Sequence, residues 1–228
     1  MLICGIYGKI IVSTSDKRSG TMNICVCHLY DEPQPSTDLV IIPPEKRYMQ
    51  EWEAKSFLEK AAAFATNHEL YVLTPMFTLH EHIAVCLVNP QGRPSLIQRA
   101  CHLTPEIEGA YSTAERLFTV QTPFGKLLIT VDIDVYDPAL THMATEDNCD
   151  AIIAIQYISD LDFSKERILF GAWRASQQTG LCTVNVTNQG HCVTSPCKSA
   201  PDPEKPNGFE STFDDRLPFC VTIIRQEG

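Results

Sequence analysis

Apolar residues are arranged along the chain in two patterns, short runs and helical spacing, and each pattern predicts one kind of element. Short runs of apolar or β-branched residues, bounded by Pro, Gly or Asn, predict buried β-strands. These runs are residues 22–29, 38–42, 70–73, 83–88, 95–103, 117–120, 127–131, 151–155, 181–186 and 217–224. Apolar residues at helical spacing predict helices at 51–67, 138–148 and 165–178. Stretches rich in Pro, Asp and Ser predict loops at 31–37 and 194–215.

The order of these elements mixes strand–helix–strand units with hairpins. Two pairs of predicted strands are separated only by turn residues, at 89–92 and at 122–125. This order predicts an α/β (α+β) sandwich with mixed sheets rather than one purely parallel sheet. The chain has no internal repeat and no linker that divides it, so we expect a single domain over residues 1–228.

The charge of the chain narrows the choice of partners. A net charge of −10 argues against non-specific binding to nucleic acid or to anionic membranes. No apolar run approaches the roughly 20 residues of a membrane-spanning helix. The first residues do not combine a basic segment with a long apolar stretch, so no secretion signal is predicted. We therefore expect a cytoplasmic protein that meets a small-molecule ligand rather than nucleic acid or membrane.

The chain has ten cysteines, and several lie inside apolar runs, among them Cys25, Cys27, Cys86 and Cys220. No pair has the Cys-x-x-Cys spacing of a zinc or redox site. Reduced cysteine behaves as a small buried hydrophobe. We predict that the cysteines are largely reduced and buried, without a disulfide network.

Three acids follow directly on the strand predicted at 127–131: Asp132, Asp134 and Asp137. Acids at the end of a buried strand lie where α/β proteins usually place their chemistry. Three interpretations are open: acids that only shape a turn, a pocket that binds a ligand, and a metal or phosphoryl-transfer site. The third rests on the Asp-x-Asp pattern, which resembles that of haloacid-dehalogenase-like phosphatases, where the pair binds Mg²⁺. That pattern normally opens its domain, whereas about half of this chain precedes it.

Several short motifs occur in a fixed order along the middle of the chain. They are DLVIIPPE (38–45), VNPQG (88–92), QRACHL (98–103), GKLLITVDIDVYDP (125–138), and CDAII (149–153) followed by WRA (173–175) and NQG (188–190). Each motif is weak alone. Together, in this order and at these spacings, they resemble the nitrilase, or carbon–nitrogen hydrolase, superfamily.

The resemblance implies a fold and an assembly. It implies a single αββα sandwich with two mixed β-sheets and helices outside, and it places the strands at 38–42 and 127–131 near each other in one sheet. It also implies a homodimer, for which the predicted helix at 165–178 carries the apolar residues Ile168, Leu169, Phe170 and Trp173.

The superfamily hydrolyses amides or nitriles with a Glu, a Lys and a nucleophilic Cys. Carried over residue by residue, the Cys position falls on Asp132 and the Lys position on Ala100. The Glu position falls on Pro44, with Glu45 one residue later. The resemblance therefore predicts a catalytically inactive relative, a pseudoenzyme with a binding or assembly role. The residues predicted to line its pocket are Glu45, Arg99, His102, Asp132 and Asp134.

Two enzymatic alternatives stay open. One is a divergent amide hydrolase that uses Glu45 and a substitute nucleophile, and the other is a Mg²⁺-dependent phosphohydrolase built on Asp132 and Asp134. The pair His80 and His82 would share one face of an extended segment, but no third ligand is evident, so a loop surface is expected there. The leading prediction has neither a metal nor a cofactor.

Overall fold

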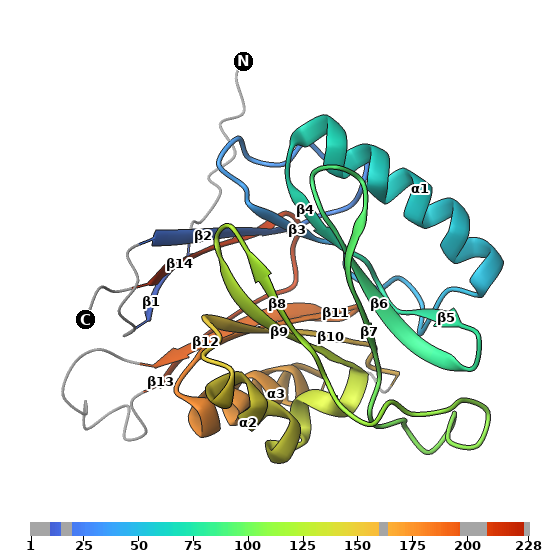
Figure 1. The fold of residues 1–228 in the computed structure, drawn as a ribbon. Helices are drawn as coiled ribbons and strands as arrows, with labels where there is room; N and C mark the ends of the chain where they lie inside the picture. The colour runs from blue at the N-terminus through green and yellow to red at the C-terminus, as the bar shows by residue number, and fades with distance from the viewer. Residues whose placement is uncertain (1–9, 15–19, 160–163, 197–208, 226–228) are drawn as a thin grey trace.

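The computed structural model describes residues 10–14, 20–159, 164–196 and 209–225. Two β-sheets pack face to face, with helix α1 (Glu51–His68) outside the first sheet and helices α2 (Pro138–Glu146) and α3 (Ser164–Thr179) outside the second (Figure 1). This is the αββα sandwich with two mixed sheets that the sequence predicts. None of the described helices is both long and apolar enough to cross a membrane.

The first sheet has eight strands in the described part of the chain. They are β1 (Ile10–Thr14), β2 (Gly20–Val26), β3 (Leu39–Ile41), β4 (Tyr71–Leu73), β5 (Phe77–Leu79), β6 (His82–Val88), β7 (Pro94–Arg99) and β14 (Phe219–Arg225). Their spatial order is β1-β14-β2-β3-β4-β6-β5, and β7 pairs with β6 as the predicted hairpin. Helix α1 covers β4, β5 and β6.

The second sheet has six strands, again among the residues that are described. They are β8 (Thr119–Thr122), β9 (Gly125–Val131), β10 (Ala151–Gln156), β11 (Cys182–Thr187), β12 (Gly190–Pro196) and β13 (Phe209–Asp214). The order is β13-β12-β11-β10-β9-β8, with β9, β10 and β11 parallel. Because parallel strands end at the same edge, the carboxyl ends of these three strands form one rim of the sheet.

One apolar core fills the space between the sheets. Leu39 and Ile41 of β3 and Leu127 and Ile129 of β9 are all fully buried in it. The prediction that these two strands share one sheet is therefore wrong, because β3 lies in the first sheet and β9 in the second. Both strands are apolar on both faces, because one face packs against the other sheet and the opposite face is covered by a helix layer. Such a pattern does not distinguish neighbours within a sheet from strands stacked across a core.

The predicted loop at 194–215 is also wrong in the part that is described. Strand β12 continues to Pro196, and β13 occupies Phe209–Asp214. Two of the hydroxyl groups that suggested a loop are paired between strands, because Thr194 Oγ1 lies 2.7 Å from Ser211 Oγ. The main-chain carbonyl of Thr194 also accepts a hydrogen bond from Ser176 Oγ of α3 at 2.9 Å. Strands β1 and β5 and the first part of β12 were not predicted either.

Candidate functional site

The end of strand β9 changes direction sharply at Asp132. The strand runs to Val131, and Asp132 begins a short 3₁₀ helix, η1 (Asp132–Tyr136). Asp132 has a φ of 52°, in the left-handed region that residues other than glycine rarely adopt. Its side chain is almost completely buried. Unusual backbone conformations of this kind concentrate at functional sites, so the strand end is the starting point for a candidate site.

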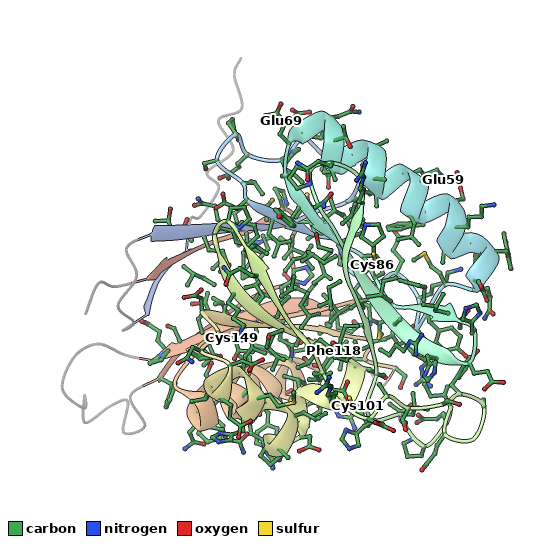
Figure 2. The ribbon with its side chains drawn as sticks, viewed as in Figure 1. Glu59, Glu69, Cys86, Cys101, Phe118 and Cys149 are labelled. Atoms are coloured by element: carbon green, nitrogen blue, oxygen red, sulfur yellow. The ribbon has the colours of Figure 1, made fainter. Side chains whose placement is uncertain are left out.

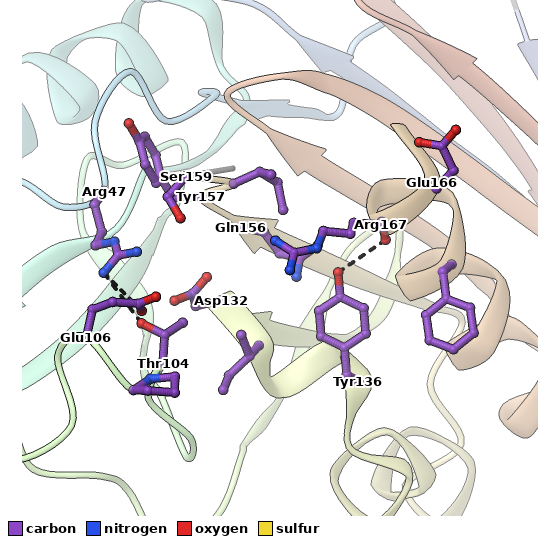
Figure 3. A pocket seen from close by; sticks show the side chains of 14 residues that line it. Arg47, Thr104, Glu106, Asp132, Tyr136, Gln156, Tyr157, Ser159, Glu166 and Arg167 are labelled. Carbon is purple, nitrogen blue, oxygen red and sulfur yellow. Dashed lines mark hydrogen bonds and ion pairs between the residues drawn. The ribbon is translucent and has the colours of Figure 1, made fainter. Parts of the chain in front are cut away.

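Asp132 lines a cavity of about 710 Å³ at the rim where β9 and β10 end (Figure 3). The rest of the lining comes from five segments: the chain around Arg47, the segment after β7, η1 itself, the end of β10 with the residues after it, and the first turns of α3. The lining residues are Arg47, Thr104, Pro105, Glu106, Asp132, Ile133, Tyr136, Gln156, Tyr157, Ile158, Ser159, Glu166, Arg167 and Phe170. The volume falls within the range that holds small-molecule ligands.

The charges around this cavity are mixed. Arg47 Nη1 lies 3.5 Å from a carboxylate oxygen of Glu106 and donates to Thr104 Oγ1, also at 3.5 Å. Burial raises the pKa of Asp132 to about 6, although the N–H of Tyr157 and the guanidinium of Arg47 act to lower it. The carboxyl group of Asp132 is therefore poised to gain or lose a proton near neutral pH.

Tyr136 and Arg167 form the side of the cavity towards helix α3. The Tyr136 hydroxyl donates to the main-chain carbonyl of Arg167 at 3.1 Å, which joins η1 to the helix. Burial raises the pKa of Tyr136, so its hydroxyl stays protonated at neutral pH. Figure 3 shows the side chains of Arg47 and Arg167 reaching towards the space beside Asp132 from opposite sides. The cavity thus offers carboxyl, guanidinium, amide and hydroxyl groups to one ligand.

Ala100 lies outside this lining. It follows the last residue of β7, is 1% exposed and belongs to the core between the sheets. The next residue, Cys101, which is labelled in Figure 2, belongs instead to a second buried cluster that includes Leu128, Val135 and Ala144 of α2. Such a separation is the one expected for neighbouring residues of an extended segment. The methyl group of Ala100 therefore lies in the core between the sheets, whereas the thiol of Cys101 lies in the apolar layer next to α2.

Glu45 and Arg99 lie apart from the Asp132 cavity. Glu45 is exposed, has an oxygen 3.5 Å from His28 Nδ1, and lines a second cavity together with His28 and Phe57. Arg99 is an exposed residue of β7. The sequence places them near Asp132 only through the order of the motifs. The structure shows that the chain after β3 turns Glu45 outwards and brings Arg47 to the cavity instead.

Asp134 holds η1 to the segment that follows β7, and the side chain of His102 lies beside it. The carboxylate of Asp134 is fully buried and accepts the N–H of Cys101 at 3.0 Å and the N–H of His102 at 2.8 Å. The His102 ring lies between Asp134 and Asp137, 3.3 Å and 3.4 Å from their oxygens, in a separate shallow depression. Among the described residues, no group of three or more His, Cys, Asp or Glu side chains is arranged to hold a metal ion.

The cavity contains residues that the sequence analysis missed, above all Arg47, Glu106, Gln156 and Arg167. Gln156 had a usable signal, because it directly follows the buried run 151–155 and strand ends collect functional groups. The other three lie on connecting segments or on the first turn of a helix. The packing of the two sheets brings these residues to the cavity, and a local sequence pattern does not indicate how the sheets pack.

The raised pKa of Asp132 makes stability depend on pH. Between about pH 4 and pH 6 Asp132 keeps a proton in the folded protein that it releases in the unfolded chain, so the contribution of Asp132 to stability falls as the pH rises through this window. Asp132→Asn removes the buried charge, and asparagine tolerates the left-handed backbone. We expect this variant to be more stable than the wild type by about 2–3 kcal/mol at pH 8, with the difference vanishing towards pH 4. Urea unfolding of both proteins across this range measures it, and a difference independent of pH would contradict it.

Comparisons with known proteins identify the fold. No protein-family model matches the chain, and no curated protein matches its sequence. An amidase from Nesterenkonia sp. has a similar structure, with a TM-score of 0.68 and 13% sequence identity over 92% of each chain. A carbon–nitrogen hydrolase from Helicobacter pylori G27 has a TM-score of 0.66 and 13% identity over 90% of each chain.

The Nesterenkonia AN1 amidase is described as a member of the nitrilase superfamily, and one of its structures shows Michael addition of acrylamide at the active-site cysteine. At 13% identity, the likeness concerns the arrangement of helices and strands and not the chemistry. That arrangement extends over nearly the whole of both chains. The chain therefore has the fold of the nitrilase superfamily of carbon–nitrogen hydrolases.

Proposed function

We propose that this protein binds a small polar molecule in the Asp132 cavity and does not hydrolyse amides or nitriles. The observation that carries the proposal is the carboxyl group at position 132. It occupies the strained end of β9, at the position where the family resemblance expects a thiol. The scaffold is that of a carbon–nitrogen hydrolase, and the group at the expected point of attack is different.

The chemistry of the substituted groups supports inactivity. A carboxylate is a weak nucleophile towards an amide carbon, and the product of its attack would be a labile anhydride. Ala100 provides no ammonium to stabilise the negative charge that develops on the attacked group. Loss of a nucleophile or of an oxyanion-stabilising group typically costs on the order of 10²–10⁶ in rate.

The lining of the cavity supports binding. Arg47 and Arg167 can pair with an anionic or carbonyl group, while Asp132 and Gln156 can pair with a hydrogen-bond donor. A ligand that carries both kinds of group would satisfy polar atoms on opposite sides of the cavity. Because Asp132 changes charge near pH 6, we expect the affinity for such a ligand to change over the same pH range.

The two enzymatic alternatives have less support. A hydrolase based on Glu45 would need that carboxylate beside position 132, whereas it lies outside the Asp132 cavity and pairs with His28. A phosphohydrolase would need Asp132 and Asp134 to share one Mg²⁺ ion. Asp134 instead directs both oxygens to main-chain N–H groups of residues 101 and 102.

Asp132→Cys tests whether this strand end faces an accessible cavity. We expect the new thiol to react with iodoacetamide faster than Cys149, whose pKa burial raises to about 12. Peptide-resolved mass spectrometry of a labelling time course compares the two sites in the same folded molecule. A ligand that fills the cavity should slow labelling of residue 132 and leave the rate at Cys149 unchanged. A thiol at position 132 that reacts as slowly as Cys149 would contradict the proposed cavity.

We also propose a cytoplasmic location and a homodimer that forms through helix α3. The described cysteines are thiols, which suits a reducing compartment. Ile168 is fully buried and cannot contribute to the dimer interface. Phe170 is 48% exposed and stacks with Tyr136 and Trp173, so it is available for that interface. Light scattering at micromolar concentration tests the dimer, and a monomeric mass would contradict it.

A further inference from the structure

Two cysteines lie opposite each other on adjacent strands of the first sheet. Cys25 of β2 and Cys220 of β14 are direct partners in the antiparallel register of the two strands. Their sulfur atoms lie 3.2 Å apart, and the thiol of Cys220 donates to the sulfur of Cys25. The two residues are 195 positions apart in the chain. In Figure 1 the two strands run side by side.

This arrangement nearly meets the geometric needs of a disulfide. Directly opposed residues of antiparallel strands have Cα atoms about 4.5–5.5 Å apart. Disulfides join Cα atoms about 4.4–6.8 Å apart, with a sulfur–sulfur bond of about 2.05 Å. Small rotations about the two Cα–Cβ bonds can close the remaining gap between the sulfur atoms, and the strands need not separate.

Other cysteines nearby are less suited to form this bond. Cys27 and Cys86 belong to the same buried cluster as Cys25 and Cys220. Cys86 lies on β6, three strand positions from β2, which corresponds to about 14 Å and is too far for a disulfide. Cys27 lies two residues from Cys25 along the chain, where a bond would have to close a very tight ring. Cys25 and Cys220 are thus the best-placed pair in this cluster.

We propose that Cys25 and Cys220 form a disulfide when the chain folds in the presence of a small disulfide oxidant. The thiolate of Cys220 attacks one sulfur of the oxidant, forms a mixed disulfide and releases one small thiol. The thiolate of Cys25 then attacks the sulfur of Cys220 and releases the second small thiol. Two protein thiols are oxidised, one oxidant disulfide is reduced, and the two protons pass to the released thiols.

Burial determines when this bond can form. In the folded protein Cys25 is 1% and Cys220 is 8% exposed. The hydrogen bond from Cys220 lowers the pKa of Cys25, but Cys27 and burial raise it, to about 12 overall. Thiolate is therefore scarce in the folded state, and exchange there is slow. The bond forms during folding, before helix and loops cover the strands, and is afterwards shielded from reductants.

Refolding tests the proposal with the full chain. The protein is unfolded in guanidinium and refolded either in a mixture of oxidised and reduced glutathione or in dithiothreitol. After trypsin digestion without reductant, the oxidised sample should contain a cross-link between peptides 19–46 and 217–225. Thiol titration of the same sample, unfolded in guanidinium, should find two fewer thiols than the ten in the sequence. The melting temperature should rise by on the order of 5–10 °C relative to the reduced sample.

Three variants assign the bond. Cys220→Ser should abolish the cross-link, whereas Cys86→Ser, in the same cluster but on a distant strand, should keep it. Cys27→Ser should keep it as well, which assigns the linkage to Cys25 because both residues lie in peptide 19–46. If the wild type keeps all its thiols after oxidative refolding, or links other cysteines, the proposal is wrong. The wild-type peptide map decides this even if a serine variant fails to fold.

Discussion

Replacing Asp134 with asparagine is expected to lower the free energy of unfolding by about 1–2 kcal/mol at pH 7, because the loss of a hydrogen bond outweighs the relief of a buried charge. That relief is part of the balance because burial raises the pKa of Asp134. One carboxylate oxygen of Asp134 accepts the N–H of Cys101, and the other accepts the N–H of His102. An amide keeps only one acceptor oxygen and turns its own NH₂ group towards the second N–H. Because the side chain is fully buried, water cannot compensate for that lost bond. Urea unfolding at pH 7 measures the change.

Asp137→Asn is the matched control. Asp137 caps helix α2 by accepting the N–H of Ala139 at 2.7 Å, and its side chain is partly exposed. Asparagine caps helices as well as aspartate does, so we expect this variant to lie within about 0.5 kcal/mol of the wild type. Equal losses in the two variants would show that Asp134 does not tether the segment at residues 101 and 102.

A lysine at position 100 is expected to destabilise the protein by about 3–5 kcal/mol at pH 7. The side chain of Ala100 is 1% exposed and lies among apolar residues of both sheets. An ammonium group placed there loses its hydration, and the lining of the Asp132 cavity does not include Ala100. Burial should lower the pKa of the introduced lysine, so the loss of stability should shrink as the pH rises towards the usual pKa of lysine.

Ala100→Met separates the effect of charge from that of size. Methionine has nearly the length of lysine and no charge, so it should show only the cost of overpacking, about 1–3 kcal/mol. The difference between the lysine and methionine variants gives the cost of the charge. If the lysine variant is at least as stable as the methionine variant at pH 7, the ammonium reaches Asp132, and position 100 faces the cavity after all.

The helices and hairpins of the fold were predictable because short stretches of sequence, through their capping residues and apolar spacing, indicate each of them. Helix α1 shows why: Gln50 and Glu53 form a capping box at its start, and Ala61 and Ala65 repeat at the spacing of its buried face. The pairing of strands across the core was not predictable, because β3 and β9 present the same apolar pattern. The strand β13 was missed because its residues are at most half-buried and polar at several positions.

The candidate site was predictable only at its centre. Asp132 was identified because a buried run ends there and the surrounding motif has a recognisable form. Asp134 was placed in the same pocket because it is two residues away, but the 3₁₀ turn directs it to the main chain of residues 101 and 102. Arg47 and Arg167 were missed because they reach Asp132 from segments that are far apart in the sequence.

The most direct test of the central claim is hydrolysis by the wild-type protein. Ammonia release from a panel of short amides and nitriles is measured at micromolar protein, next to Asp132→Asn and a protein-free blank. Without a thiolate at position 132 and an ammonium at position 100, we predict no release above the blank from either protein. Release by the wild type that disappears in Asp132→Asn would show that this carboxyl group is catalytic, and it would contradict the proposal that the cavity binds its ligand without hydrolysing it.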